Sequence, residues 1–114
     1  MKSNLSQKII RSHLVKPSAL TPGEEISIRI DQTLTHDINA VMCYLAFEGI
    51  GIPRVKTEVS VSYLDHNLLY VDSKTPDDHI FLQTLAKHYG IWLSRSGNGI
   101  MHAVQFARFG IPGK

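Results

Sequence analysis

Apolar side chains recur at three- and four-residue intervals in four segments, the spacing that places them on one face of a helix. The segments cover about residues 4–15, 38–48, 76–89 and 100–109. The third has the clearest ends, because Thr75 can act as a cap and Pro76 suits the first helical position. Gly90, directly after it, is the residue type that most often ends a helix. The pattern therefore predicts a helix in each of these segments.

Polar and apolar residues alternate between the helices, and such alternation is typical of a half-buried strand. It is regular over residues 25–30 and 59–64, and a shorter strand is expected over residues 91–94. Strands joined through helices usually pair in parallel, with right-handed crossovers. The sequence therefore predicts an α/β fold over residues 1–114: a single small domain of two or three layers, with a mostly parallel sheet.

Large apolar side chains on the predicted elements are expected to form the core: Met42, Phe47, Phe81 and Trp92. Three histidines lie on predicted helices, show no metal-ligand spacing and are expected at the surface: His13, His79 and His88. Cys43 lies among apolar residues of the second helix, where it is expected to pack as a small hydrophobic side chain.

The composition fits one folded domain better than a disordered chain. The chain has 114 residues, of which 43% are hydrophobic and 19% are charged. The formal net charge of +2 is small and no run of lysine and arginine concentrates it, so no nucleic-acid partner is expected. The N-terminus lacks the apolar stretch of a secretion signal, and no segment approaches the ~20 apolar residues of a membrane-spanning helix. We therefore expect no membrane partner.

The cysteine content limits both the compartment and the cofactors. Cys43 is the only cysteine, so the chain cannot form an internal disulfide, which fits a reducing compartment such as the cytoplasm. An iron–sulfur cluster usually takes three or four thiolates, so this chain alone cannot hold one. No zinc spacing or phosphate-binding P-loop is present either, and no metal ligand is predicted in the chain.

Candidate catalytic residues follow the predicted strands, where open α/β sheets bind their ligands. His36 follows the first strand, Asp65 and His66 follow the second, and His102 follows the third after a glycine turn. An aspartate beside a histidine can fix the imidazole tautomer and hold the ring protonated, which suits a general acid. The alternative is an aspartate that starts a turn beside a solvent-exposed histidine.

The other two positions also have simpler explanations. The glycine turn of residues 97–99 leads into a helix whose free amides can attract an anion, but such glycines are often needed only for positive φ. His102 can equally be an interior histidine with its hydrogen bonds satisfied. His36 and Asp37 fit a helix-capping arrangement as well as a ligand contact.

Four segments together resemble the early part of aconitases and isopropylmalate dehydratases, in the same order and at similar intervals. They are residues 28–37 (IRIDQTLTHD), 62–67 (SYLDHN), 89–91 (YGI) and 97–102 (GNGIMH). These segments resemble those of bacterial-type aconitate hydratases most. The resemblance implies the N-terminal part of the aconitase fold.

The resemblance also implies roles for individual residues. The residues matching Asp65 and His66 form a catalytic pair in which the histidine protonates the departing hydroxyl and the aspartate orients it. The residue matching His102 belongs to a second pair beside the iron-bound water, and the one matching His36 lines the substrate pocket. The family removes and re-adds water on a tricarboxylate or related hydroxy acid, with a four-iron four-sulfur cluster as the Lewis acid.

The sequence departs from the family pattern in ways that affect this expectation. It does not contain the family's three cluster cysteines, the serine base or the substrate arginines, so the chain is predicted to be inactive alone. His36, Ser96, Met101 and Ala103 replace other common residues, which leaves citrate, homocitrate and isopropylmalate open as substrates. An alternative is a stand-alone, non-catalytic α/β binding or interaction module. In either case exposed apolar surface is expected to favour self-association.

Overall fold

The computed structural model describes residues 3–17 and 19–114, and its centre is a three-stranded parallel sheet. The strands are β3 (Gln32–His36), β4 (Val59–Tyr63) and β5 (Trp92–Ser94), in that order across the sheet. In the register, Leu34 lies beside Val61, and Val61 lies beside Trp92. The predicted α/β fold with a mostly parallel sheet is confirmed at this level.

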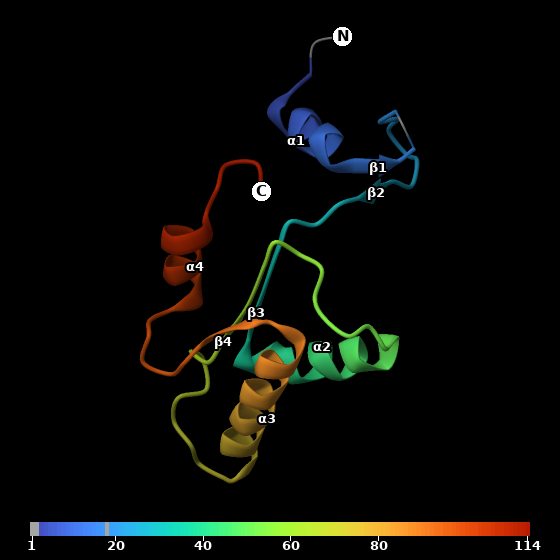
Figure 1. The fold of residues 1–114 in the computed structure, drawn as a ribbon. Coiled ribbons are helices and arrows are strands. Elements are labelled where there is room, and N and C mark those ends of the chain that lie inside the picture. The colour runs from blue at the N-terminus through green and yellow to red at the C-terminus, as the bar shows by residue number, and fades with distance from the viewer. Residues whose placement is uncertain (1–2, 18) are drawn as a thin grey trace.

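Helices cover both faces of the sheet, so the fold has three layers (Figure 1). α2 (Asp37–Ile50) connects β3 to β4, and α3 (Lys74–Tyr89) connects β4 to β5. These two crossover helices pack against one face, around a core of Ala40, Tyr44, Leu64, Leu82, Leu85, Ala86 and Ile91. α4 (Met101–Phe109) follows β5 and packs on the opposite face against Val61 and Tyr63.

The central strand β4 explains this layering. Val61 and Tyr63 point to the α4 face, while Ser60, Ser62 and Leu64 alternate with them and point to the other face. The four residues from Ser60 to Tyr63 are all buried, as expected for the middle strand of a sheet that is covered on both sides.

The N-terminal region differs from the sequence prediction. α1 (Leu5–His13) ends before the predicted residue 15, and β1 (Leu14–Lys16) follows it at once. Leu14, the C-cap of α1, is already extended, with φ −66° and ψ 126°, and Pro17 favours extended backbone in Lys16 at the end of β1. β1 pairs antiparallel with the short β2 (Ser27–Ile28) in a separate sheet.

The predicted first strand of the parallel sheet, residues 25–30, was therefore wrong. The segment that joins β4 is Gln32–His36, and only Ser27–Ile28 of the predicted strand is extended and paired. Polar and apolar residues alternate regularly over residues 25–30, whereas Leu34 is the one apolar residue of Gln32–His36. A regular alternation therefore does not reveal which segment pairs with the central strand. The β-branched Thr33 and Thr35 suit a strand position, and Thr33 bonds its hydroxyl to Ser60 at 2.6 Å.

The helix ends are close to their predicted positions. α3 begins at Lys74 after the N-cap Ser73, so Thr75 lies inside the first turn and does not cap the helix. The carboxylate of Asp72 takes over that role and accepts the backbone N–H of Lys74 at 3.0 Å. Gly90 ends α3 in the left-handed conformation, as predicted, with φ 76°.

Several burial predictions were wrong. Met42 is 77% exposed, Trp92 is 67% exposed, and Cys43 is also exposed. Phe47 and Phe81 pack against the core as expected. His79 was expected at the surface but is only 3% exposed, and the His13 side chain is also largely covered, whereas His88 is exposed.

The molecule is elongated, with a radius of gyration of 17.0 Å. A compact chain of this length has about 13 Å. Figure 1 shows why: α1, β1 and β2 lie at one end, away from the sheet and its crossover helices. In the described ranges, no helix combines the length and the hydrophobicity needed to cross a membrane.

Candidate functional site

Three histidines meet at the carboxyl ends of the parallel strands. His36 is the last residue of β3, His66 lies in the loop after β4, and His102 lies in the first turn of α4. The His36 and His66 rings stack with their centroids 4.2 Å apart. The His102 ring meets His66 edge-on, with the centroids 6.1 Å apart. The structure therefore brings together the histidines that the sequence singled out.

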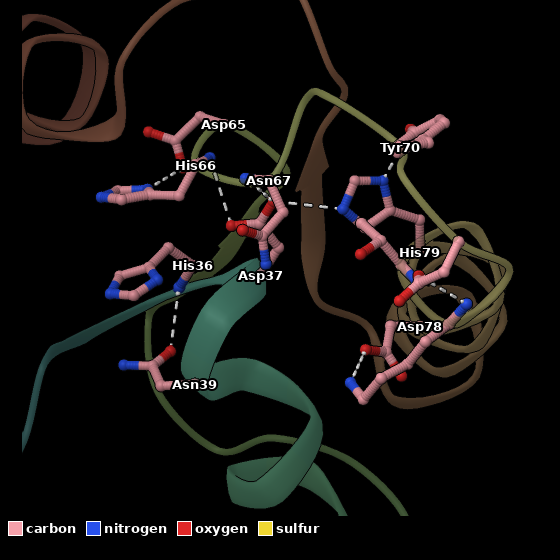
Figure 2. A network of polar contacts seen from close by, with 12 residues as sticks. His36, Asp37, Asn39, Asp65, His66, Asn67, Tyr70, Asp78 and His79 are labelled. Carbon is pink, nitrogen blue, oxygen red and sulfur yellow. Dashed lines mark hydrogen bonds and ion pairs between the residues drawn. The ribbon is translucent and has the colours of Figure 1, made fainter.

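Asp65 ties two of these segments together. Its Oδ1 lies 2.8 Å from His66 Nδ1, and its Oδ2 accepts the backbone N–H of Met101 at 2.7 Å. The first contact fixes the His66 ring, and the second holds the start of α4 beside it. Because a carboxylate only accepts, His66 Nδ1 carries a hydrogen and Nε2 is the nitrogen left for other partners. Figure 2 shows the His66 ring beside the Asp65 carboxylate, with a dashed line marking their contact.

The Asp65 carboxyl is held in its charged form. Burial alone raises the pKa of this group, but the hydrogen bonds from Met101 and His66 outweigh the burial. The resulting pKa lies below the ordinary value of 3.8. The side chain is also 6% exposed, against 31% for His66. A buried carboxylate thus contacts a partly exposed imidazole through Nδ1.

His36 has a buried ring nitrogen without a partner among the described residues. Its backbone N–H donates to Asn39 Oδ1 at 3.1 Å, which helps to cap α2. Its Nδ1 atom is buried and makes no hydrogen bond to any described residue. Asp37, expected as the cap, is instead the first residue of α2, and His36 occupies the N-cap position. The capping explanation and a ligand-facing role are therefore compatible for this residue.

Sequence reasoning missed the contacts of Asp37. This carboxylate is 4% exposed and accepts the backbone N–H of His66 at 3.2 Å and that of Asn67 at 2.9 Å. His79 Nε2 lies 3.1 Å from the same carboxylate (Figure 2). The sequence signal was only an aspartate at a helix start, which most often serves the helix itself. Asp37 reaches the loop after β4 because β3 and β4 pair in parallel and end at the same edge of the sheet.

His36, Asp37 and His66 each offer a ligand atom within 4.8 Å of the others, but their geometry does not suit a metal ion. The planes of the His36 and His66 rings differ by only 23°, so the in-plane lone pairs of stacked rings do not converge. The Asp37 oxygens already accept three N–H groups. A single cysteine in the sequence also excludes a cluster held by this chain alone.

A hollow of about 730 Å³ lies on the α4 face of the sheet. His102 lines it together with Gln32, Leu34, Gln105 and Phe106, among others. Asp65 and His66 do not line this hollow, and among the three histidines of the site His102 is the one that does. Gln32 and Gln105 bond to each other at its wall, with 3.1 Å between their side chains.

Known proteins match the chain over nearly its whole length. It is 27% identical to homocitrate dehydratase of Saccharomyces cerevisiae, with 96% of the chain aligned. It is 30% identical to the large subunit of 3-isopropylmalate dehydratase of Thermoanaerobacter pseudethanolicus over 91% of the chain. A probable aconitate hydratase of Dictyostelium discoideum is 26% identical over 96% of the chain.

The chain spans only a part of these relatives. It covers 16% of the length of the yeast and Dictyostelium proteins and 25% of the bacterial subunit. No model of a protein family matches the sequence, and no solved structure is significantly similar to it. Proteins of three related dehydratase types nevertheless align with 91–96% of it, and the chain therefore belongs to the aconitase and isopropylmalate dehydratase family.

Proposed function

We propose that this chain is the N-terminal segment of an aconitase-type hydro-lyase and that it supplies one side of the active site. In this proposal residues 1–114 form a single α/β domain, the N-terminal part of the aconitase fold. The substrate is a tricarboxylate or a related hydroxy acid, from which the enzyme removes water and to which it adds water back. The cytoplasm is the proposed location.

One observation carries the proposal: a buried aspartate lies behind the exposed histidine at the meeting point of three strand ends. Asp65 holds His66 through Nδ1, which leaves Nε2 as the atom that can give a proton. Hydroxide is a poor leaving group, so a dehydration needs a proton donor at the departing oxygen. The charged Asp65 compensates the charge of the protonated ring.

The neighbouring histidines suit an anionic substrate. His36 stacks on His66 and keeps an unpartnered nitrogen among the described residues, and the His102 ring meets His66 edge-on. Imidazole N–H groups donate to carboxylate oxygens, and a helix start such as that of α2 favours negative charge. His36 is therefore assigned to substrate binding, and Asp65, His66 and His102 to catalysis.

The four-iron four-sulfur cluster of the family does not fit the donor set of this chain. Cys43 is the only thiol, and it lies on α2 at an exposed position. In the complete enzyme the cluster supplies a Lewis acid, and other parts of the protein hold it. The contribution of this chain is limited to placing the proton donor, its carboxylate and the two flanking histidines.

The test compares the 114-residue chain with the complete protein in which it occurs. After anaerobic reconstitution with iron and sulfide, we expect the chain alone to retain no stoichiometric iron and to show no hydration of cis-aconitate. The complete protein is expected to retain iron and to dehydrate citrate, homocitrate or isopropylmalate. A complete protein that dehydrates none of these hydroxy acids would support the alternative, a non-catalytic binding or interaction module.

A further inference from the structure

We propose that His79 is a positioning residue for His66, acting through the Asp37 carboxylate and the backbone of the loop after β4. The inference rests on the proposed function, because it assigns to His79 an effect on the proton donor of that site. His79 itself lies in α3 and bonds only to Asp37 and Tyr70 among the described residues.

Hydrogen bonds to Asp37 hold the loop after β4, which carries His66. Residues 65–67 follow β4 after one intervening residue, Leu64, and Asp37 accepts the backbone N–H groups of both His66 and Asn67. A loop whose backbone donates to a buried carboxylate has fewer accessible conformations than one in solvent. The position of the His66 ring relative to His36 and His102 therefore depends on where the Asp37 side chain lies.

The Asp37 side chain is in turn held by a hydrogen bond from His79. His79 Nε2 donates to Asp37 Oδ2 at 3.1 Å, so that one oxygen serves both Asn67 and His79. The pair is almost completely buried, with 4% of the His79 side chain and 1% of the Asp37 side chain exposed. A buried carboxylate that loses one of its donors shifts toward other donors or water, because an unsatisfied charge is costly there.

The orientation of the His79 ring is set in part by its contact with Tyr70. The Tyr70 hydroxyl lies 3.0 Å from His79 Nδ1, and the two rings meet edge-on with centroids 5.5 Å apart. Because Nε2 must carry a hydrogen to donate to Asp37, this contact helps to keep the ring facing the carboxylate. Figure 2 shows the resulting chain from Tyr70 through His79 and Asp37 to the backbone beside His66.

His79→Leu removes the donor and keeps a side chain of similar size, whereas His79→Gln keeps an N–H donor at a similar distance from the backbone. In the complete enzyme we expect His79→Leu to lower kcat per folded active site about 10- to 100-fold, since a misplaced catalytic group has effects of that order. KM is expected to stay within about threefold, because His66 acts on the departing hydroxyl and contributes less to binding. His79→Gln is expected to restore most of the turnover.

A second readout does not depend on activity. Amide hydrogen exchange of His66 and Asn67 is expected to accelerate about fivefold or more in His79→Leu, while the amide of Val61 in β4 keeps its wild-type rate. Leu82→Val is the matched control, because Leu82 is a buried core residue of the same helix without a polar contact to Asp37. It should reduce stability without a selective change at these two amides and without lowering kcat per folded site.

Tyr70→Phe keeps the proposal testable if His79→Leu does not fold, and a smaller change in the same direction is expected for it. Wild-type kcat in folded His79→Leu, or equal losses in His79→Leu and His79→Gln with unchanged exchange at His66 and Asn67, would overturn the inference. A complete protein without dehydratase activity whose two amides still accelerate would contradict the proposed function and leave the structural link intact.

Discussion

His36 and His66 stack with their ring centroids 4.2 Å apart, although they come from the ends of two different strands. The contact exists because β3 and β4 are parallel neighbours in which His36 is in register with Tyr63, so both strands end at the same edge. The crossover helix α2 then starts between them and presents Asp37 to the loop that carries His66. The site is thus a direct product of the βαβ connection.

Replacing Asp65 by asparagine should separate charge from geometry in the catalytic pair. The amide oxygen can still accept one hydrogen bond, but the negative charge behind His66 is lost. We expect kcat of the complete enzyme to fall about 100-fold or more, the range for loss of general acid catalysis. Steady-state kinetics of Asp65→Asn measure this effect. Asp78→Asn is the control, since the Asp78 side chain bonds to Lys74 and makes no hydrogen bond to His36, His66 or His102; equal losses in both variants would contradict the assigned role.

The N-terminal helix is held by a pair of groups that responds to pH. His13 Nδ1 bonds to the Ile9 carbonyl and Nε2 bonds to the Asp31 carboxylate, and both partners are acceptors, so the ring is an imidazolium. The Ile9 carbonyl first, and then Asp31, raise the pKa of His13 above 6.5. The hydrogen bond from His13 lowers the pKa of Asp31 below 3.8, against the effect of burial and with help from Arg29.

These shifts predict a window of stability. The contribution of His13 is fully present below pH 6.5 and disappears as the pH rises through its raised folded pKa. That of Asp31 is present above pH 3.8 and disappears as the pH falls through its lowered folded pKa. The stability difference between the wild type and His13→Ala should therefore be largest between these limits. Urea denaturation across pH measures it, with the exposed His88→Ala as control; a difference that grows above neutral pH would refute the assignment.

Gly90 and Gly51 allow a matched test of helix ends. Both end a helix in the left-handed conformation, with φ 76° and 75°. Alanine in that region costs about 1–2 kcal/mol, so Gly51→Ala and Gly90→Ala should each lower the free energy of unfolding by about that amount. Gly90→Ala should lose more, because its Cβ would approach the Arg54 side chain to 2.4 Å, whereas nothing lies near Gly51. Thermal or urea unfolding of both variants gives the comparison, and equal losses would show that Arg54 moves aside freely.

Exposed apolar side chains predict self-association of the isolated chain. Ile38, Met42 and Leu45 form a stripe along α2, and Phe106 on α4 is 81% exposed. Sedimentation velocity of the 114-residue chain should show species larger than the monomer at micromolar concentration. Met42→Glu and Phe106→Glu should reduce them, and Thr84→Glu, at an exposed polar position, should not. A monomer under all these conditions would contradict the prediction.

Local chemistry made the helices and the site positions predictable. Gly90 ends its helix as expected, and the predicted strand of residues 59–64 differs from β4 by one residue. His36, His66 and His102 could be placed together because parallel strands end at one edge of a sheet. Each of these predictions depends on a short segment and on a general rule of chain geometry.

The burial and strand predictions that were wrong all depend on contacts with residues distant in the sequence. Met42 and Trp92 have the hydrophobicity of core residues, but within this chain nothing covers their faces of α2 and β5 in the described ranges. His79 has the spacing of a surface residue, yet it is buried because Asp37 and Tyr70 satisfy both ring nitrogens. Residues 32–36 form a strand of the parallel sheet because they pair with β4. The alternation of polar and apolar residues does not reveal which segments pair.

The role of His66 as proton donor is tested by the turnover of His66→Ala in the complete enzyme, with substrate binding measured in parallel. The ring of His66 is held by Asp65 and flanked by His36 and His102, so its loss should remove the proton donor and leave most contacts to the substrate. We expect kcat to fall about 100-fold or more while the dissociation constant of the hydroxy acid changes only severalfold. Turnover near that of the wild type would contradict the assignment of His66 as the acid.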